Sequence, residues 1–213
     1  MFKKGDFIQV DFIGKTKDDN KVFDLTREED AKKHNLHNPK TRYKPLIVCI
    51  GERNLLKGLD DFLIEKAPGK YTIDLKSEEA FGTKNPQLIK MVPLNIFQKQ
   101  NIKPFPGLRI NMDNIIGTVR TVSGGRVVMD FNHPLAGREV TYEIDVKGPL
   151  TDTNEKIQGF LEVTLGVSDF ELKDNNLIIN AQLPEAYQKP ISDTLKRLIP
   201  EVKEIHFKTP NPS

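Results

Sequence analysis

The segment from residue 125 to 146 constrains the fold more than any other part of this sequence, because two strand-like patterns flank a single turn. Val127, Met129 and Phe131 share one side of the first pattern, and the apolar positions 140, 142, 144 and 146 share one side of the second. A spacing of two is typical of half-buried β-strands. The turn between them reads Asn-His-Pro-Leu-Ala-Gly, residues 132–137. The segment therefore predicts two strands joined at one fixed turn.

The chain as a whole has the composition of a soluble globular protein. It has 213 residues, 29% of them charged and 37% hydrophobic, which is enough for one large domain or two to three small ones. The longest apolar run, residues 46–50, is far too short to span a bilayer, and the first residues lack the apolar stretch of a secretion signal. The lone cysteine, Cys49, cannot form an intramolecular disulfide. We therefore expect a cytoplasmic protein without a membrane partner.

Charge is distributed unevenly along the chain. Residues 84–132 carry seven Lys or Arg against two Asp or Glu, whereas the whole chain has a net charge of only +2. A basic segment can contact nucleic acid, but this one has no recognised reading motif and no dense basic stripe with aromatic residues between the charges. Nucleic acid is therefore not the expected partner.

The first half of the chain predicts strands and one amphipathic helix. The helix is indicated by apolar residues at helical spacing, namely Leu55, Leu56, Leu59, Phe62 and Leu63. The other predicted elements are a hairpin of strands 7–13 and 21–24, a polar excursion 26–44 with a helical run at 28–34, and strands 46–50 and 71–75.

The second half predicts a small β-rich module followed by an α+β tail. The module is expected to hold a short helix at 94–99 and strands around 108–112, 115–122 and 126–131. The tail is expected to read as strand 160–165, a hairpin turned at 174–176, a helix and a final strand 204–208. For that helix, Ser192 or Asp193 could cap the start, and Pro200 ends it.

No motif for a conventional catalytic or metal site is present. The sequence has no nucleophile elbow, phosphate-binding loop, dinucleotide fingerprint or paired-cysteine motif. His34 and His37 are three residues apart, but no further ligand is placed to complete a metal site with them. We therefore expect no metal and no cofactor.

Six short motifs follow one another in the order and approximate spacing of a known family. They are Val10-Asp11-Phe12-Ile13-Gly14, Val22-Phe23-Asp24, Ile50-Gly51-Glu52, Leu55-Leu56-Lys57-Gly58-Leu59, Ala80-Phe81-Gly82 and Thr141-Tyr142-Glu143-Ile144. With the Asn-His-Pro-Leu-Ala-Gly turn, this set resembles the FKBP peptidyl-prolyl cis-trans isomerases, in particular SlyD-like members with an inserted flap domain. The chain looks like a long-type archaeal FKBP.

The resemblance implies an α+β fold with three domains. Residues 1–83 and 133–150 would form a discontinuous isomerase domain, an antiparallel sheet with a short helix. Residues 84–132 would form the β-rich inserted flap domain, and residues 151–213 a small α+β C-terminal domain that either packs on the isomerase domain or mediates self-association.

The resemblance also implies the site residues. The proline pocket would be lined by Phe12, Phe23, Leu46, Leu55, Leu56, Leu59, Phe81 and Tyr142, with Asp24 as its single carboxylate. The backbone N–H of Leu56 would bind the substrate carbonyl. Two positions depart from the common family pattern, because Leu59 stands where a Trp is frequent and Phe81 lacks a phenol. The loss of that phenol removes a ligand hydrogen bond and predicts weaker binding of macrolide inhibitors.

Three functions are compatible with the sequence. The first, implied by the resemblance, is a prolyl isomerase that acts on unfolded or partly folded proline-containing chains, with holdase chaperone activity from the apolar inserted domain. The second is a binding module that recognises proline-containing peptides with little turnover. The third is an assembly protein that dimerises through the tail. Phe12, Phe23 and Tyr142 would look the same from their spacing alone if they were ordinary core residues.

Overall fold

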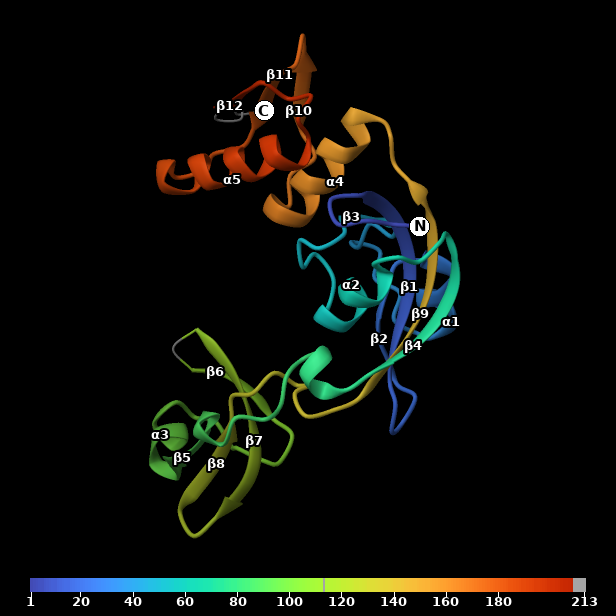
Figure 1. Ribbon diagram of the computed structural model, residues 1–213. Coiled ribbons are helices and arrows are strands. Elements are labelled where there is room, and N and C mark those ends of the chain that lie inside the picture. The colour runs from blue at the N-terminus through green and yellow to red at the C-terminus, as the bar shows by residue number, and fades with distance from the viewer. Residues whose placement is uncertain (113, 209–213) are drawn as a thin grey trace. The chain divides into compact units, whose positions relative to one another are not determined.

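Five antiparallel strands form the main sheet of the protein (Figure 1). The computed structural model describes residues 1–112 and 114–208, and the chain forms two units, residues 1–75 with 140–213 and residues 76–139. The strands of the main sheet are β1 (Phe7–Thr16), β2 (Val22–Leu25), β3 (Leu46–Cys49), β4 (Gly69–Leu75) and β9 (Val140–Pro149). Within the described residues, no helix is long and apolar enough to cross a membrane.

The long strand β1 organises this sheet. One of its edges pairs with β3 through its first residues and with β2 through its last residues, while its other edge pairs with β9, which in turn pairs with β4. Phe7 and Ile8 are both buried although they point to opposite faces, at 2% and 0% exposure. The start of the sheet is therefore covered on both faces, which a simple alternating pattern does not reveal.

Two short helices belong to the same part of the chain, α1 (Glu28–Lys33) and α2 (Lys57–Leu63). α2 buries Leu59 and Leu63, as its apolar spacing predicts. Asp60 on α2 is also buried, and its carboxylate accepts hydrogen bonds from the backbone N–H groups of Gly51 (2.9 Å) and Arg53 (3.2 Å). A buried carboxylate with two backbone donors fixes the loop that leads into α2.

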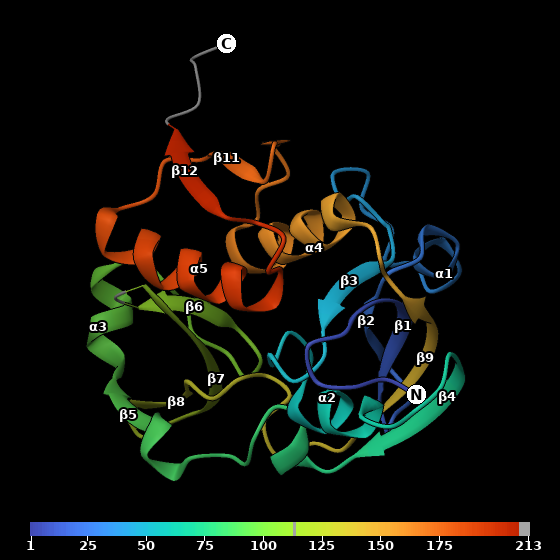
Figure 2. The same cartoon turned by 45° about the horizontal axis from the view of Figure 1, so that its top comes forward.

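The tail forms a second, three-stranded sheet with two longer helices. Its elements are α4 (Thr153–Leu165), β10 (Phe170–Lys173), β11 (Asn176–Asn180), α5 (Glu185–Leu198) and β12 (Glu204–Lys208). β10 and β11 form the predicted antiparallel hairpin, and β12 pairs with β11 in parallel. Figure 2 shows α4 and α5 on one side of this sheet, where apolar residues of both helices and all three strands share one core.

The tail departs from the prediction at two places. The predicted strand 160–165 is wrong, because these residues are the last turns of α4. The Asp152 side chain caps that helix by accepting the N–H of Glu155, and Gly166 ends it in the left-handed conformation. The predicted cap of the later helix at Ser192 or Asp193 is also wrong, since α5 starts at Glu185 and contains Pro190 in its interior.

The tail packs directly on the main sheet. Phe7 and Cys49 lie in the same apolar core as the tail residues Ile157 and Leu161. Polar contacts flank that core, among them a two-pronged ion pair in which the Arg197 guanidinium donates to both carboxylate oxygens of Glu52, each at 2.8 Å.

Residues 76–139 form a separate four-stranded antiparallel module. It contains the short helical turns η1 (Ser77–Glu79) and η2 (Pro86–Leu88), the helix α3 (Leu94–Lys99) and the strands β5 (Ile89–Pro93), β6 (Arg109–Met112), β7 (Ile115–Ser123) and β8 (Arg126–Asp130). The strand order is β5-β8-β7-β6. The predicted α3 and the last three strands are confirmed, whereas β5 was not predicted. Phe97, Val127 and Met129 form the centre of the module's core.

Candidate functional site

Three aromatic side chains meet on one face of the main sheet. The Tyr142 ring on β9 makes edge-to-face contacts with Phe12 on β1 and with Phe23 on β2, with ring centroids 5.7 Å and 5.9 Å away. Tyr142 is almost fully buried, while Phe12 and Phe23 are half-buried. Such pairs contribute about 0.5–1.5 kcal/mol each beyond the area that they bury. The cluster therefore holds a rigid aromatic wall with partly accessible rings, which is suited to receive a small apolar ring.

A β-bulge brings Phe23 and Asp24 to this same cluster. The pairing of β1 with β2 runs Gly14 to Asp24 and then Lys15 to Val22, so Phe23 is an extra residue on β2. Neighbouring residues of a regular strand point to opposite faces, whereas a bulge changes the direction of one side chain. Accordingly, the Phe23 ring contacts the Tyr142 ring while Asp24 accepts a hydrogen bond from the Tyr142 hydroxyl at 3.3 Å.

The Asp24 carboxylate lies at the accessible rim of the cluster. Partial burial of the Asp24 carboxylate raises its pKa above the ordinary value. Hydrogen bonds from the Tyr142 hydroxyl and from the Leu25 backbone N–H oppose this effect without cancelling it. Burial of Tyr142, and after it the contact with Asp24, raise the pKa of the phenol, so the phenol stays protonated and serves as a donor. The Asp24 side chain remains accessible to solvent.

The four predicted leucines lie in the same unit as the aromatic cluster. Leu46 is half-buried and pairs with Val10 at the junction of β3 and β1, and Leu59 is buried on α2. Leu55 and Leu56 are half-buried in the loop that Asp60 anchors, and Leu56 is the residue before the first turn of α2. Among the described residues, no hydrogen bond engages the Leu56 N–H. That the four leucines line a proline pocket stays a prediction.

Phe81, the remaining predicted pocket residue, lies in the unit formed by residues 76–139. Its ring stacks on the imidazole of His133 from the Asn-His-Pro-Leu-Ala-Gly turn, with a centroid distance of 4.7 Å and an interplanar angle of 4°. A backbone hydrogen bond from Gly137 to Gly82 (2.8 Å) joins the same two segments. Two stretches far apart in the sequence are thus fixed together within this module.

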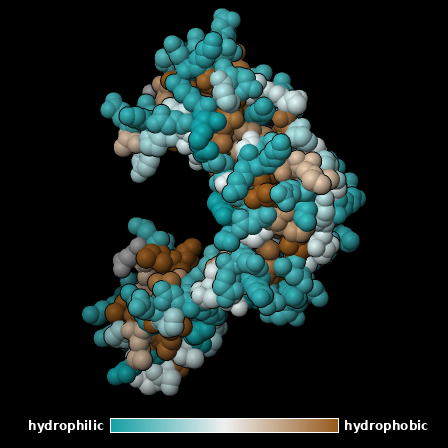
Figure 3. Space-filling model, in the orientation of Figure 1, coloured by the Kyte–Doolittle hydropathy of each residue, from teal (hydrophilic) through white to brown (hydrophobic). Residues whose placement is uncertain are grey.

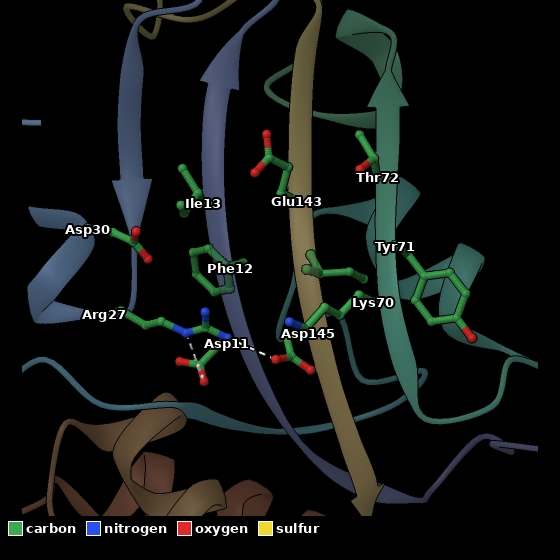
Figure 4. Close-up of a pocket in the computed structure, with 11 residues that line it drawn as sticks. Asp11, Phe12, Ile13, Arg27, Asp30, Lys70, Tyr71, Thr72, Glu143 and Asp145 are labelled. Carbon is green, nitrogen blue, oxygen red and sulfur yellow. Dashed lines mark hydrogen bonds and ion pairs between the residues drawn. The ribbon is translucent and has the colours of Figure 1, made fainter. Parts of the chain in front are cut away.

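A charged pocket of about 310 Å³ occupies the other face of the main sheet (Figure 4). Arg27 lies between two carboxylates there, with Nε 3.3 Å from Asp11 and a terminal nitrogen 3.0 Å from Asp145. The buried Asp11 also accepts a hydrogen bond from the Thr26 hydroxyl at 2.8 Å. Each carboxylate has partners, so this network stabilises the sheet and α1. The sequence did not predict it, because Asp11 and Asp145 come from separate strands and Arg27 precedes α1.

The two histidines considered as metal ligands have other roles. His37 stacks on Tyr43 and contacts Glu28, and His34 ends α1. Over residues 1–112 and 114–208, no three metal-ligating side chains come together in a possible site.

Comparison with known proteins identifies the family. Residues 1–95 match the FKBP-type peptidyl-prolyl cis-trans isomerase family, and residues 90–135 match the family described as FKBP26, IF domain. The short-type peptidyl-prolyl cis-trans isomerase of Methanocaldococcus jannaschii is 31% identical over 148 residues, which cover 69% of this chain and 93% of that protein. The chain belongs to the FKBP-type peptidyl-prolyl cis-trans isomerases.

Two bacterial FKBP relatives extend this result. The SlyD protein of Pasteurella multocida is 34% identical over 119 residues, which cover 54% of this chain and 59% of SlyD. The FKBP-type 16 kDa isomerase of Escherichia coli is 32% identical over 108 residues, covering 48% of this chain and 72% of that enzyme. The α+β fold with antiparallel sheets agrees with this FKBP assignment.

Proposed function

We propose that this FKBP catalyses rotation of X-Pro peptide bonds at the cluster of Phe12, Phe23 and Tyr142, with Asp24 and the Leu56 N–H as its polar groups. The observation that carries the proposal is the edge-to-face contact of both Phe rings with Tyr142, beside an accessible carboxylate. The wall of the pocket would receive the proline ring. The clients would be unfolded or partly folded chains that contain proline.

The pocket needs no proton transfer to act. An X-Pro bond is held planar by amide resonance, with a barrier of about 18–20 kcal/mol. Rotation breaks the resonance, so the twisted transition state is less charge-separated than the planar amide. A dry aromatic wall removes solvation that favours the planar state, and a fixed N–H can bind the carbonyl after it has turned. Each ~1.4 kcal/mol of preference for the twisted state accelerates rotation about tenfold.

Turnover of a short X-Pro tetrapeptide, measured in a protease-coupled assay, tests this site. We expect Phe23→Ala and Tyr142→Ala to lower kcat/KM by at least about tenfold, since each removes a wall of the pocket. Phe62→Ala is the matched control, because Phe62 is a half-buried aromatic that contacts Tyr71 away from the cluster. An equal loss in all three variants would place catalysis elsewhere. Retained peptide binding without turnover in the wild type would instead favour a binding module.

We further propose that the module of residues 76–139 acts as a holdase for the same clients. Several of its large apolar side chains are exposed, among them Met91 at 60%, Phe105 and Ile115 at 57% and Ile116 at 53%. Figure 3 shows apolar surface gathered on this module. A groove of about 290 Å³ lies next to Ile115 and has a mainly apolar lining, formed by Leu88, Lys90, Val92, Met112, Ile115 and Phe131. Exposed apolar surface of this kind binds unfolded segments with little sequence preference.

Suppression of aggregation of a reduced, unfolding client protein tests the holdase. We expect Ile115→Ser with Ile116→Ser to weaken suppression several-fold while tetrapeptide turnover persists. Leu36→Ser is the control, because Leu36 is 44% exposed in the other unit. Unchanged suppression in the double variant would contradict the proposal.

We also propose that the protein is a long-type archaeal FKBP with an additional C-terminal domain. The archaeal short-type relative matches 148 of the 213 residues, so a substantial part of this chain lies outside that match. That part includes the tail, which shares its core with Phe7 and Cys49.

A further inference from the structure

A glycine lies between the two polar members of the proposed site. In the register of the main sheet, Gly14 on β1 is opposite Asp24 on β2 and also opposite Tyr142 on β9. Neighbouring strands are about 4.8 Å apart, so Asp24 and Tyr142 are two strand spacings, roughly 10 Å, apart at their backbones. A side chain at position 14 would stand between them on the same face.

The absence of that side chain allows the Tyr142 phenol to cross β1. A Cβ atom built on Gly14 would lie 2.8 Å from Tyr142 Cζ, 2.9 Å from Tyr142 Cε1 and 3.1 Å from Phe23 Cζ. These distances are shorter than van der Waals contact, so any other residue would displace the ring. The Tyr142 hydroxyl thereby reaches Asp24 Oδ2 at 3.3 Å.

We propose that Tyr142 is a positioning residue for isomerisation, because its hydroxyl, reaching over Gly14, donates to the Asp24 carboxylate and holds it in one orientation at the rim of the pocket. The proposal rests on the function proposed above. An ionised carboxylate has oxygens that only accept hydrogen bonds. Its negative charge would favour the twisted amide, whose carbonyl carbon has lost electron donation from nitrogen and is more electropositive.

Among the groups around Asp24 that favour its ionised form, the Tyr142 hydroxyl has the largest effect. From β2 itself, only the Leu25 backbone N–H favours the ionised form, and burial opposes it. The charged residues nearby on β1 and β9, Lys15 and Glu143, pair with each other at 2.5 Å. On α2, Lys57 pairs with Asp61 at 2.9 Å. Removal of the Tyr142 hydroxyl should therefore move the Asp24 pKa further upward.

The experiment compares the pH dependence of tetrapeptide turnover in the full-length wild type, Tyr142→Phe and Asp24→Asn. Tyr142→Phe keeps the aromatic wall and removes only the hydroxyl. We expect a rate about three- to tenfold lower at pH 7 and an acid limb displaced to higher pH, with a parallel upward shift in the ¹³C titration of the Asp24 carboxyl. Tyr71→Phe is the matched control, since Tyr71 also loses one hydroxyl hydrogen bond, to the Ala67 carbonyl at 2.7 Å, outside the proposed pocket.

A merely structural role for Tyr142 predicts a different result. The rate would then fall equally at all pH values, and the Asp24 titration would stay unchanged, which would overturn the inference. Additive rate losses in the double variant Asp24→Asn with Tyr142→Phe would also overturn it, because a positioning residue loses its effect when its target is gone. If Asp24→Asn itself has full activity, the proposed site is wrong as well.

Gly14→Ala provides a second, independent variant. It retains both polar groups but should push the phenol away from Asp24, so we expect the same displacement of the acid limb. Urea unfolding followed by circular dichroism gives the fraction of Gly14→Ala that is folded, and the rate is expressed per folded molecule. A folded Gly14→Ala protein with the wild-type pH profile would contradict the cross-strand geometry.

Discussion

Gly159 on α4 provides the sharpest test of how the tail is attached to the main sheet. A Cβ atom built on Gly159 would lie 2.2 Å from Ile47 Cγ2, 2.5 Å from Ile47 Cβ and 3.3 Å from the Ile47 carbonyl oxygen. Ile47 belongs to β3, and its Cβ cannot move without its backbone. Gly159→Ala therefore requires α4 and β3 to move apart by about 1 Å to restore ordinary contact between these atoms.

Two opposing effects decide the sign of this substitution. Alanine in a helix interior is favoured over glycine by about 0.5–1 kcal/mol. Excess volume in a packed core costs about 1–3 kcal/mol, and this contact is much closer than ordinary packing. We expect the steric cost to win, with a net loss of ~1–2 kcal/mol in the free energy of unfolding.

Urea unfolding followed by circular dichroism measures this loss as a lower transition midpoint with an unchanged slope. Gly148→Ala is the control, because no atom lies within 4 Å of a Cβ built there. The cost of Gly159→Ala should also shrink when Ile47→Ala removes the closest atom. A Gly159→Ala protein as stable as the wild type, or more stable, would refute the close packing of α4 on β3.

Three further predictions concern charge and reactivity. Hydrogen bonds from Arg197 lower the pKa of Glu52. This pair therefore stabilises the fold above the unfolded pKa of about 4.3, and the stabilisation is lost as the pH falls through the lower folded pKa. In Arg197→Met, the free energy of unfolding measured in urea should depend less on pH between about pH 5 and 3, and an unchanged pH dependence would contradict this. Burial raises the pKa of Cys49 to about 12, so a thiol reagent should modify it only after unfolding, and rapid modification of the native protein would show that the tail core opens. His34→Ala and His37→Ala should retain tetrapeptide turnover with a flat rate profile from about pH 6 to 8, because neither histidine belongs to the aromatic cluster; a bell-shaped profile abolished in either variant would implicate that residue.

The sequence predicted the sheets where one face is apolar and the other is polar. β8 and β9 follow from alternation around the Asn-His-Pro-Leu-Ala-Gly turn, and α2 follows from its helical spacing. The same reasoning fails at α4, because the apolar residues of 160–165 fit a strand as well as a helix, and the cap at Asp152 with the end at Gly166 makes the segment helical. The start of α5 was also misplaced, because the helix begins at Glu185, before the predicted cap at Ser192 or Asp193, and contains Pro190. Local apolar content identifies which segments are buried, while the capping residues distinguish a helix from a strand.

The candidate site was only partly predictable for a different physical reason. The resemblance pointed to Phe12, Phe23, Asp24 and Tyr142, and the structure brings these four together. Spacing alone could not, since Phe23 and Asp24 are adjacent and a regular strand would send them to opposite faces. The bulge on β2 resolves this conflict, and its position depends on pairing with β1. The role of Gly14 cannot be read from the sequence either, because it depends on the strands that pair with β1. Gly14 lies between β2 and β9, and its missing side chain lets the Tyr142 phenol on β9 reach the Asp24 carboxylate on β2.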